Sequence, residues 1–337
     1  MKMKRITGAV LLLAVFASGC KKPEEPAYTQ KTFIMSVPAL VKVYGAPEAA
    51  GKALAGEIFA EWERVSSEFS YSDPYSLTTL VNKKAYGEWV KVDDEFLRLL
   101  ILSLDYYRLT GGAFDITFAP LWPLWKEAAS TRVMPAKAEI QKALANIGSD
   151  AIQVDVVRKL VRFTKPVQIN MGGLLRGYCF ERAQKILLER RPPYAVELHL
   201  GGNMLVYGDR TWEYGVMDPF KAGKRKGSLR FSGGIIMSSS GRDSFVEIEG
   251  KLYSHILNLK TGYPIENFSN LTVYFPALDN GNSMASAALA VMGRENAFKL
   301  LASMPGAAAV WLDGYGEPYV FTNAASKAAW EPQKGLF

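Results

Sequence analysis

The sequence contains few residues that could cross-link the chain or bind a transition metal. Of its 337 residues, only two are cysteines, Cys20 and Cys179, and only two are histidines, His199 and His255. If Cys20 carries a lipid, as argued below, no intramolecular disulfide can form, and no paired-cysteine motif is present. Stability must therefore come from a hydrophobic core, which a chain of this length with 49% hydrophobic residues can build.

Long apolar runs are also absent, except in the first twenty residues. There, Lys2, Lys4 and Arg5 precede an apolar run over 6–18 that is too short to span a bilayer, which takes about 20 helical residues. This pattern predicts a secretory signal peptide over 1–19. Its end, 17–20 (ASGC), resembles a bacterial lipobox whose cysteine becomes lipidated, the alternatives being an uncleaved anchor or an ordinary signal peptide.

Residues 20–30 then read as a polar tether that joins lipidated Cys20 to the folded part. We expect the protein to be lipid-anchored on a bacterial membrane and to face the periplasm. The residue after Cys20 is not Asp, which favours the outer over the inner membrane.

Clustered positive charge and the common nucleotide motifs are missing as well. The formal net charge of +7 includes the three basic residues of the signal, and no basic stripe is interleaved with aromatic residues, so no nucleic-acid partner is indicated. The sequence has no Gly-x-Gly-x-x-Gly fingerprint and no Gly-x-Ser-x-Gly elbow. The segment 45–53 superficially resembles a phosphate-binding loop, but its spacing is wrong and it ends in Ala.

Hydrophobic periodicity predicts helices and strands in alternation along the rest of the chain. Helices are expected at 46–68, 93–109, 174–190, 282–292 and 294–303. Hairpins are expected at 151–163 and 307–321, and strands at 167–170, 194–200, 212–217, 235–239, 244–249 and 252–257, with a further strand after the turn at 201–203. We predict one α+β domain over 31–325, with mixed or antiparallel sheets flanked by helices, and a C-terminal tail over 326–337.

Small-residue turns follow several of the expected strands. They lie at 111–112, 172–173, 201–202, 238–241 and 261–262. Any one of them alone is most simply a turn. Taken together they favour a nucleotide-sized ligand, because glycines let a backbone approach a ligand closely and Gly172-Gly173 opens a helix whose N–H groups suit a phosphate.

These segments, taken in order, resemble the FAD:protein FMN transferase family, the flavin transferase lipoproteins known as ApbE. The resemblance runs from about 33 to 321. Its pieces are Met35, 69–71 (FSY), 110–117 (TGGAFDIT), 169–178 (INMGGLLRGY), 200–203 (LGGN), 239–241 (SSG) and 255–264 (HILNLKTGYP). It implies an ApbE-like, T-fold-related architecture.

The resemblance also implies a reaction and a set of site residues. FAD would be the substrate, with its pyrophosphate on Mg²⁺, and a Thr hydroxyl of an acceptor protein with a Ser/Thr-Gly-Ala-Thr-type motif would attack it. FMN would become attached and AMP would leave. The implied FAD-binding residues are Met35, Tyr71, Ala113, Phe114, Asp115, Asn170, Arg176, Ile256, Leu257 and Thr261, with Trp122 and Trp125 as further candidates to flank the flavin. Asp115 and His255 are the candidate bases.

Several positions depart from the family pattern, and they concern acids and metal ligands. At the family's metal positions stand Gly173, Ser283 and Ala287, where an Asp and a Thr side chain would be expected at the last two. Magnesium prefers charged oxygen ligands, so its binding is doubtful here. Two hypotheses follow: an FMN transferase with weak or rearranged metal binding, or a flavin-binding carrier lipoprotein that has lost the chemistry. Hydrolysis of FAD to FMN and AMP, a third hypothesis, would need the same metal.

Overall fold

An eight-stranded antiparallel sheet is the central layer of the computed structural model, which describes residues 25–242, 245–277 and 286–333. Its strand order is β1-β2-β6-β7-β10-β15-β16-β17, and every neighbouring pair is antiparallel. The strands are β1 (Tyr28–Ile34), β2 (Val37–Tyr44), β6 (Ala195–Leu200), β7 (Asn203–Tyr207), β10 (Gly234–Ser240), β15 (Phe268–Phe275), β16 (Ala308–Asp313) and β17 (Pro318–Thr322).

Four smaller sheets surround the central one. A three-stranded sheet in the order β18-β9-β8 packs against it, and a second, β3-β5-β4, lies among the helices. The remaining two are the pairs β11-β12 and β13-β14. The strands are β3 (Val90–Lys91), β4 (Ile152–Asp155), β5 (Leu160–Phe163), β8 (Trp212–Met217), β9 (Arg225–Phe231), β11 (Phe245–Ile248), β12 (Lys251–Ser254), β13 (Leu257–Asn258), β14 (Tyr263–Pro264) and β18 (Ala329–Pro332).

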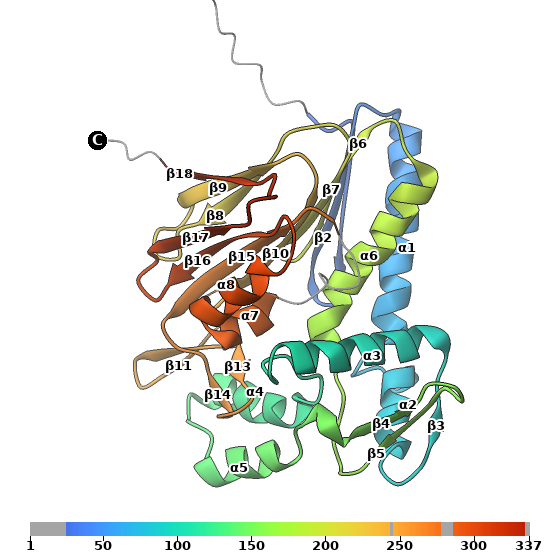
Figure 1. Ribbon diagram of the computed structural model, residues 1–337, viewed down its shortest axis with the longest axis vertical. Coiled ribbons are helices and arrows are strands. Elements are labelled where there is room, and N and C mark those ends of the chain that lie inside the picture. Colours follow the sequence, from blue (N-terminus) through green and yellow to red (C-terminus); the bar gives the residue numbers. More distant parts are fainter. Residues whose placement is uncertain (1–24, 243–244, 278–285, 334–337) are drawn as a thin grey trace, which may run out of the picture.

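Helices cover the other face of the central sheet. In Figure 1, α1 and α6 lie side by side next to β1 and β2, and α7 lies near β10 and β15. The α-helices are α1 (Glu48–Glu68), α2 (Leu77–Lys84), α3 (Asp94–Leu109), α4 (Trp122–Thr131), α5 (Lys137–Ala145), α6 (Gly172–Arg190), α7 (Ser286–Met292) and α8 (Arg294–Ala302). Two short 3-10 helices, Ala119–Leu121 and Ser149–Ala151, complete the set.

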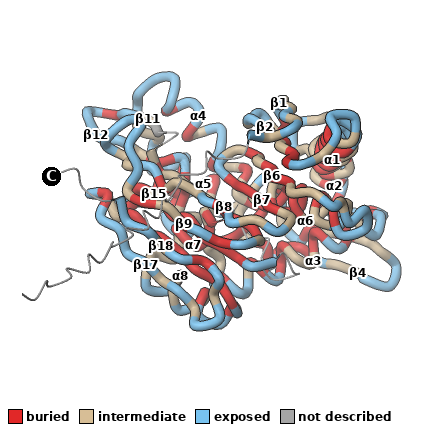
Figure 2. Tube along the Cα trace, turned by 90° about the horizontal axis from the view of Figure 1, so that it is seen from above, coloured by how far each residue is buried: buried red, intermediate tan, exposed pale blue. Residues whose placement is uncertain are grey.

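The apolar stripe of α1 shows how these layers hold together. Leu54, Ile58, Trp62 and Val65 follow helical spacing and are fully buried against the sheet and α6. The indole Nε1 of Trp62 donates to the carbonyl oxygen of Cys179 at 2.7 Å, which fixes α1 against α6. Cys179 is buried, and burial raises the pKa of its thiol. Figure 2 shows buried residues along the inner strands and the inward helix faces.

Most predicted elements are confirmed, and so is the α+β fold class. The strand predicted at 167–170 is wrong. Val167 and Ile169 are buried and alternate with polar residues, but no strand in the described part of the chain pairs with them. Instead, the amide side chain of Asn82 bonds to both the N–H and the C=O of Ile169, each at 2.8 Å. A side chain from α2 therefore satisfies the backbone that a neighbouring strand would otherwise satisfy.

The ends of the described chain contribute strands that the sequence did not indicate. β1 begins at Tyr28, inside the predicted tether, and β18 lies inside the predicted C-terminal tail, where it pairs with β9. The helix predicted at 282–292 is present as α7 from Ser286, and its first positions, including Ser283, lie outside the described residues. No helix in the described part of the chain combines the length and apolarity needed to cross a bilayer.

Candidate functional site

Two adjoining cavities share two lining residues, Arg176 and His255. We call the first, of about 290 Å³, the inner cavity. It is lined by residues from the 113–118 loop, the start of α6, the 255–259 segment and α7: Ala113, Phe114, Asp115, Ile116, Phe118, Trp122, Asn170, Gly172, Gly173, Arg176, His255, Ile256, Leu257, Leu259, Ala287, Ala288 and Val291.

The second cavity, of about 540 Å³, we call the β8 groove. It lies between the three-stranded sheet and the ends of β6 and β10 in the central sheet. Its lining residues are Val37, Pro38, Arg176, Gly201, Gly202, Tyr214, Gly215, Val216, Met217, Asp218, Pro219, Ser238, Ser239, Ser240, Arg242, His255, Asn270 and Thr272. Together the two cavities provide room for an elongated ligand on both sides of Arg176 and His255.

The N-terminus of α6 opens at the inner cavity. Gly172 and Gly173 line it, and the side-chain oxygen of Asn170 accepts from the N–H of Gly172 at 2.9 Å. Asn170 is held in turn by its own N–H, which donates to the carbonyl of Ile116 at 2.6 Å. A 19-residue helix presents the positive end of its dipole here. The arrangement suits an anionic group.

Arg176 lies one turn into the same helix and is the main cation of the site. Burial lowers the pKa of its guanidinium, and the described residues offer it no hydrogen bond or ion pair. Its Nη1 lies beside the tight turn at Gly201, where the backbone has φ of +61° and an added Cβ would come within 3.3 Å of it. A partly desolvated guanidinium without a protein partner can still gain from a ligand, and a bidentate phosphate is the ligand that its planar fork fits best.

Asp115 lies in the wall of the inner cavity, but its carboxylate is engaged elsewhere. Oδ1 accepts from the N–H of Thr117 at 2.8 Å, from the hydroxyl of Thr117 at 2.6 Å and from the hydroxyl of Ser149 at 2.7 Å, and Oδ2 accepts from the N–H of Ser149 at 3.1 Å. The side chain is 6% exposed. Four hydrogen bonds make Asp115 the support of the 113–118 loop and a poor candidate for a base.

His255 follows the last residue of β12 and is exposed between the two cavities. The backbone directly after it is fixed, because the N–H of Ile256 donates to the hydroxyl of Ser254 at 3.0 Å. Ile256 and Leu257 then line the inner cavity. An accessible imidazole on a fixed backbone can accept a proton from a group bound at the cavity junction.

Residues 258–262 form a tight turn whose geometry accounts for the asparagine at its start and the glycine at its end. Asn258 caps it, since its carbonyl accepts from the N–H groups of Thr261 and Gly262 at 3.1 and 2.8 Å. Gly262 has φ of +78°, and an added Cβ would lie 2.4 Å from the side chain of Ile140, so only glycine fits. Trp125 donates from its indole to the carbonyl of Gly262 at 2.9 Å. Trp125 therefore supports the turn, whereas Trp122 lies at the inner cavity.

Three residues that the sequence assigned to FAD line neither cavity. Met35 lies in the β1–β2 turn with φ of 53° and faces a separate cavity of about 310 Å³. Tyr71 donates to the side-chain oxygen of Gln168 at 3.0 Å, and Thr261 lies exposed in the turn just described. Their contact with FAD stays a prediction.

Sequence analysis missed several other residues that line the two cavities. Phe118 and Val291 enter the inner cavity, and Met217 and Arg242 enter the β8 groove. The first two lie near predicted site residues, so proximity in sequence was a usable signal. Arg242 and Met217 are brought to the site by the packing of separate sheets, which has no local signature.

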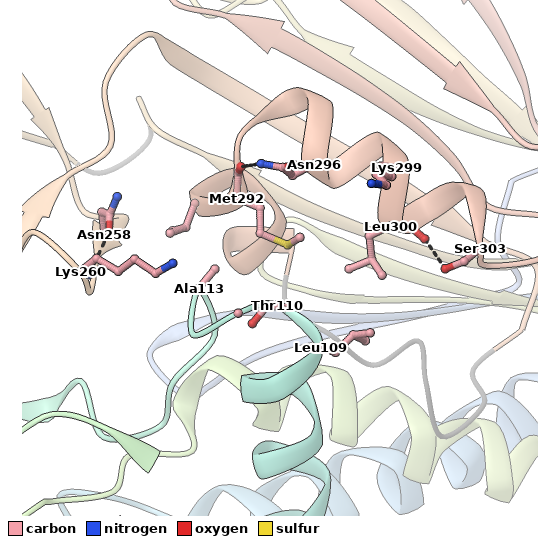
Figure 3. Close-up of a pocket in the computed structure, with 12 residues that line it drawn as sticks. Leu109, Thr110, Ala113, Asn258, Lys260, Met292, Asn296, Lys299, Leu300 and Ser303 are labelled. Carbon is pink, nitrogen blue, oxygen red and sulfur yellow. Dashed lines mark hydrogen bonds between the residues drawn. The ribbon is translucent and has the colours of Figure 1, made fainter. Parts of the chain in front are cut away.

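A third cavity, of about 590 Å³, lies on the other side of the 110–113 loop and shares Ala113 and Val291 with the inner cavity. Figure 3 shows it between Lys260, Lys299 and the end of α3. Its other polar side chains are satisfied locally: Asn296 donates to the carbonyl of Met292 at 3.1 Å and Ser303 to that of Leu300 at 2.7 Å. Its two cations, Lys260 and Lys299, are exposed, and no helix of the described chain has its first residue in the lining, so the Arg176 site is better suited to bind a phosphate.

The predicted metal positions do not make a magnesium site from the described residues. Gly173 and Ala287 line the inner cavity without a side-chain ligand, and Ser283 lies outside the described residues. The oxygens of Asp115 are engaged as described above. Within 25–242, 245–277 and 286–333, no three His, Cys, Asp or Glu side chains cluster as metal ligands would.

A helix N-terminus, a half-buried arginine and an exposed histidine at one junction define an anion-binding site suited to group transfer. Comparison with known proteins identifies the family. Residues 35–311 match the ApbE family, and the chain therefore belongs to it, as predicted.

The relatives agree with this assignment. The chain is 26% identical over 242 residues to an FAD:protein FMN transferase of Klebsiella pneumoniae (strain 342), which covers 71% of this chain and 74% of the relative. It is 23% identical over 308 residues to that of Treponema pallidum (strain Nichols), covering 85% and 84%. Among solved structures, the ApbE protein of Thermotoga maritima superposes with a TM-score of 0.78 at 25% identity, covering 88% of this chain and 97% of the other. The flavin transferase ApbE of Vibrio cholerae, 20% identical, has the same fold, with a TM-score of 0.74 over 90% of this chain and 98% of the other.

Proposed function

We propose that this protein transfers FMN from FAD to the hydroxyl of a threonine in an acceptor protein and releases AMP. One observation carries the proposal: the half-buried guanidinium of Arg176 has no partner among the described residues and lies one turn from the glycine-opened N-terminus of α6. A pyrophosphate would satisfy both groups at once. The family assignment and the names of the relatives support FAD as the ligand that brings this pyrophosphate.

The reaction balances without a redox partner. The acceptor hydroxyl oxygen bonds to the phosphorus on the riboflavin side of FAD, and the bond from that phosphorus to the bridging oxygen breaks. AMP leaves with the bridging oxygen. The hydroxyl proton passes to the imidazole of His255 and from there to solvent or to the departing phosphate. His255 suits this role better than Asp115, because His255 is exposed at the junction whereas the Asp115 carboxylate already accepts four hydrogen bonds.

Arg176 and α6 would supply the electrostatic part of catalysis. Phosphoryl transfer depends mainly on alignment and on neutralising charge on the phosphoryl oxygens. The guanidinium and the helix N-terminus hold positive charge in place before the substrate binds, so little reorganisation is needed during the reaction. The inner cavity, which contains Phe118, Trp122, Leu257 and Val291, offers an apolar surface for a ring.

The experiment that tests this function is a transfer assay with an acceptor domain that carries a Ser/Thr-Gly-Ala-Thr-type motif. We expect intact-mass analysis to show a gain equal to FMN minus water, with one AMP released per acceptor modified. The assay should be run without metal and with Mg²⁺, Mn²⁺ and Ca²⁺. If FAD binds and neither product appears under any of these conditions, transfer is contradicted.

That last outcome would support a second candidate function, a flavin-binding carrier. The observation that favours it is Ala287, which lines the inner cavity where the family resemblance leads one to expect a metal-binding threonine. A carrier would bind FAD or FMN and release it unchanged. Equilibrium dialysis followed by chromatography of the bound flavin separates the two functions, because only the transferase consumes FAD.

We also propose that the protein works in the periplasm, anchored through lipidated Cys20 and preferentially in the outer membrane. The support is the sequence of the first twenty residues, a basic start, a short apolar run and a cysteine at its end. Replacing the cysteine, C20A, should move the protein from the membrane fraction to the soluble fraction. An unchanged distribution would contradict the anchor.

A further inference from the structure

The β8 groove is bordered by a strand with an open edge. β8 is the last strand of the β18-β9-β8 sheet, and no described strand pairs with its other side. Residues 214–219, the second half of β8 and the turn after it, line the groove. An open strand edge beside a groove can bind an extended polypeptide through main-chain hydrogen bonds.

Part of the opposite wall consists of small residues, because β10 pairs with β7 over a shorter stretch than with β15. β10 pairs with β15 from Ile235 to Ser240, but with β7 only from Gly234 to Ile236. The β6–β7 hairpin turns at Gly201-Gly202, and past that turn Ser238 and Ser239 line the groove. The short hairpin therefore leaves the space that forms the groove, and glycine and serine make up the wall at this point.

The charged side chains of the groove that have no oppositely charged partner among the described residues are positive. Arg242 stacks over the ring of Phe220 at 4.3 Å, and the described residues give it no carboxylate partner. Asp218 is the acid in the lining, and it accepts from the N–H of Phe220 at 2.9 Å and lies 3.8 Å from the ammonium of Lys226. Arg242 and Arg176 thus remain to interact with a ligand.

We propose that the β8 groove binds the target segment of the acceptor protein as an extended chain that adds to the open edge of β8. The inference rests on the proposed function and specifies its partner site. The groove and the inner cavity meet at Arg176 and His255, so a segment in the groove places its hydroxyl where the flavin phosphate and the imidazole meet. The glycine and serine wall requires small residues beside that hydroxyl, and Arg242 favours an acidic side chain farther along the segment.

The test blocks the groove at Gly202 and leaves the nucleotide cavity intact. An added Cβ at Gly202 meets only Ser238, at 3.8 Å from its Cβ and 3.9 Å from its oxygen, so G202L fits without backbone strain and projects toward the groove wall. The matched control is G233L. Gly233 also has open space for a Cβ, and both glycines accept a tyrosine hydroxyl on their carbonyl, Gly202 from Tyr214 at 2.7 Å and Gly233 from Tyr274 at 2.9 Å. Gly233 lines none of the three cavities.

The probe is a short fluorescein-labelled peptide that contains Ser-Gly-Ala-Thr. Its binding is measured by fluorescence anisotropy in the presence of FAD. We expect G202L to weaken peptide binding by about 5- to 150-fold, the effect of a steric mismatch of 1–3 kcal/mol, and to leave FAD affinity unchanged. G233L should bind both ligands as the unaltered protein does. A second pair compares R242A, expected to weaken the peptide about fivefold, with R230A, whose guanidinium pairs with Glu331 at 3.2 Å outside the groove.

The outcomes separate the groove from the proposed function. Equal peptide binding by G202L and G233L overturns the groove assignment, and so does a protein that binds FAD but not the peptide. Loss of FAD affinity in G202L also overturns it, because the groove would then hold part of the nucleotide. If the peptide binds in the groove but no FMN is transferred by the unaltered protein, the groove assignment stands and the transferase function fails.

Discussion

The inner cavity and the β8 groove meet at the same two residues but are built in different ways. Loops and helix ends form the inner cavity, and most of its lining is apolar, as Ile116, Leu257 and Val291 show. Strand edges and turns form the groove, and its lining is rich in glycine and serine. The difference supports the proposal that one side receives a rigid ring and the other a flexible chain. The chemistry then belongs to the junction, where Arg176 and His255 lie.

The largest expected effect is at this junction and tests the division of roles between His255 and Asp115. H255A should lower the rate of FMN transfer by a factor of about 10²–10⁴, the usual contribution of a general base, while FAD affinity stays the same. Single-turnover kinetics by intact mass, together with FAD titration, provide the two measurements. A variant with an unchanged transfer rate would remove His255 from the mechanism.

The second effect concerns binding on the nucleotide side. R176M keeps the side-chain bulk but removes the charge, and we expect it to weaken FAD binding by about 10- to 150-fold, as for a lost charged hydrogen bond worth 1.5–3 kcal/mol. Riboflavin has no phosphate, so its affinity should not change. R190M, at the far end of the same helix, is the control. If FAD and riboflavin lose affinity equally, the cavity wall and not the charge is responsible.

The third effect should appear in stability. D115N places an amide N–H against the N–H of Ser149, which now donates to Oδ2 at 3.1 Å. We expect a loss of about 1–3 kcal/mol in the free energy of unfolding, the cost of an unsatisfied buried donor. H255A should change stability by less than about 0.5 kcal/mol, as surface substitutions usually do. Urea unfolding of both variants measures the contrast, and equal stabilities would contradict the structural role given to Asp115.

The smallest effect lies outside both cavities, at Glu197 on β6. Burial opposes ionisation of Glu197, but hydrogen bonds from His199 at 2.6 Å, Tyr44 at 2.6 Å and Lys42 at 2.9 Å outweigh it and lower the pKa from 4.5 to about 2. Because the folded-state pKa is the lower one, this carboxylate stabilises the protein above pH 4.5, and the contribution is lost as the pH falls toward 2. E197Q should cost about 1–2 kcal/mol at pH 7 and flatten this acid dependence.

E197Q also serves as a control for the comparison of the inner cavity with the β8 groove, since Glu197 lines neither of them. FAD affinity and peptide affinity of E197Q should equal those of the unaltered protein at neutral pH. Thermal unfolding followed from pH 7 to pH 3 provides the check. A variant with the same acid dependence as the unaltered protein would show that other carboxylates dominate in this range.

Sequence predicted the elements with strong local periodicity. The helices α1, α3 and α6 appear within two residues of their predicted bounds, because each carries a buried stripe at helical spacing. The strand β15 was missed, since residues such as Phe268, Leu271 and Val273 belong to a strand buried on both faces and show no alternation. The false strand at 167–170 arose because the Asn82 side chain, distant in sequence, satisfies that backbone.

In the site, too, the parts that carry local sequence motifs were predicted, and the parts formed by residues distant in sequence were not. The loop at 113–115, the α6 start and the 255–257 segment were predicted from motifs, and all three line the inner cavity. The role of Asp115 was not predictable, because its donor Ser149 comes from a different segment. The groove was not predictable either, since it depends on where β7 ends against β10 and on how β8 packs beside them.

A crystal structure of the protein with FAD bound is the most direct test of the account. We predict the pyrophosphate within hydrogen-bond distance of the Arg176 guanidinium and the N–H groups that open α6, with the groove beside β8 left open for the acceptor. Phosphates bound instead at Lys260 and Lys299, on the far side of the 110–113 loop, would contradict the account.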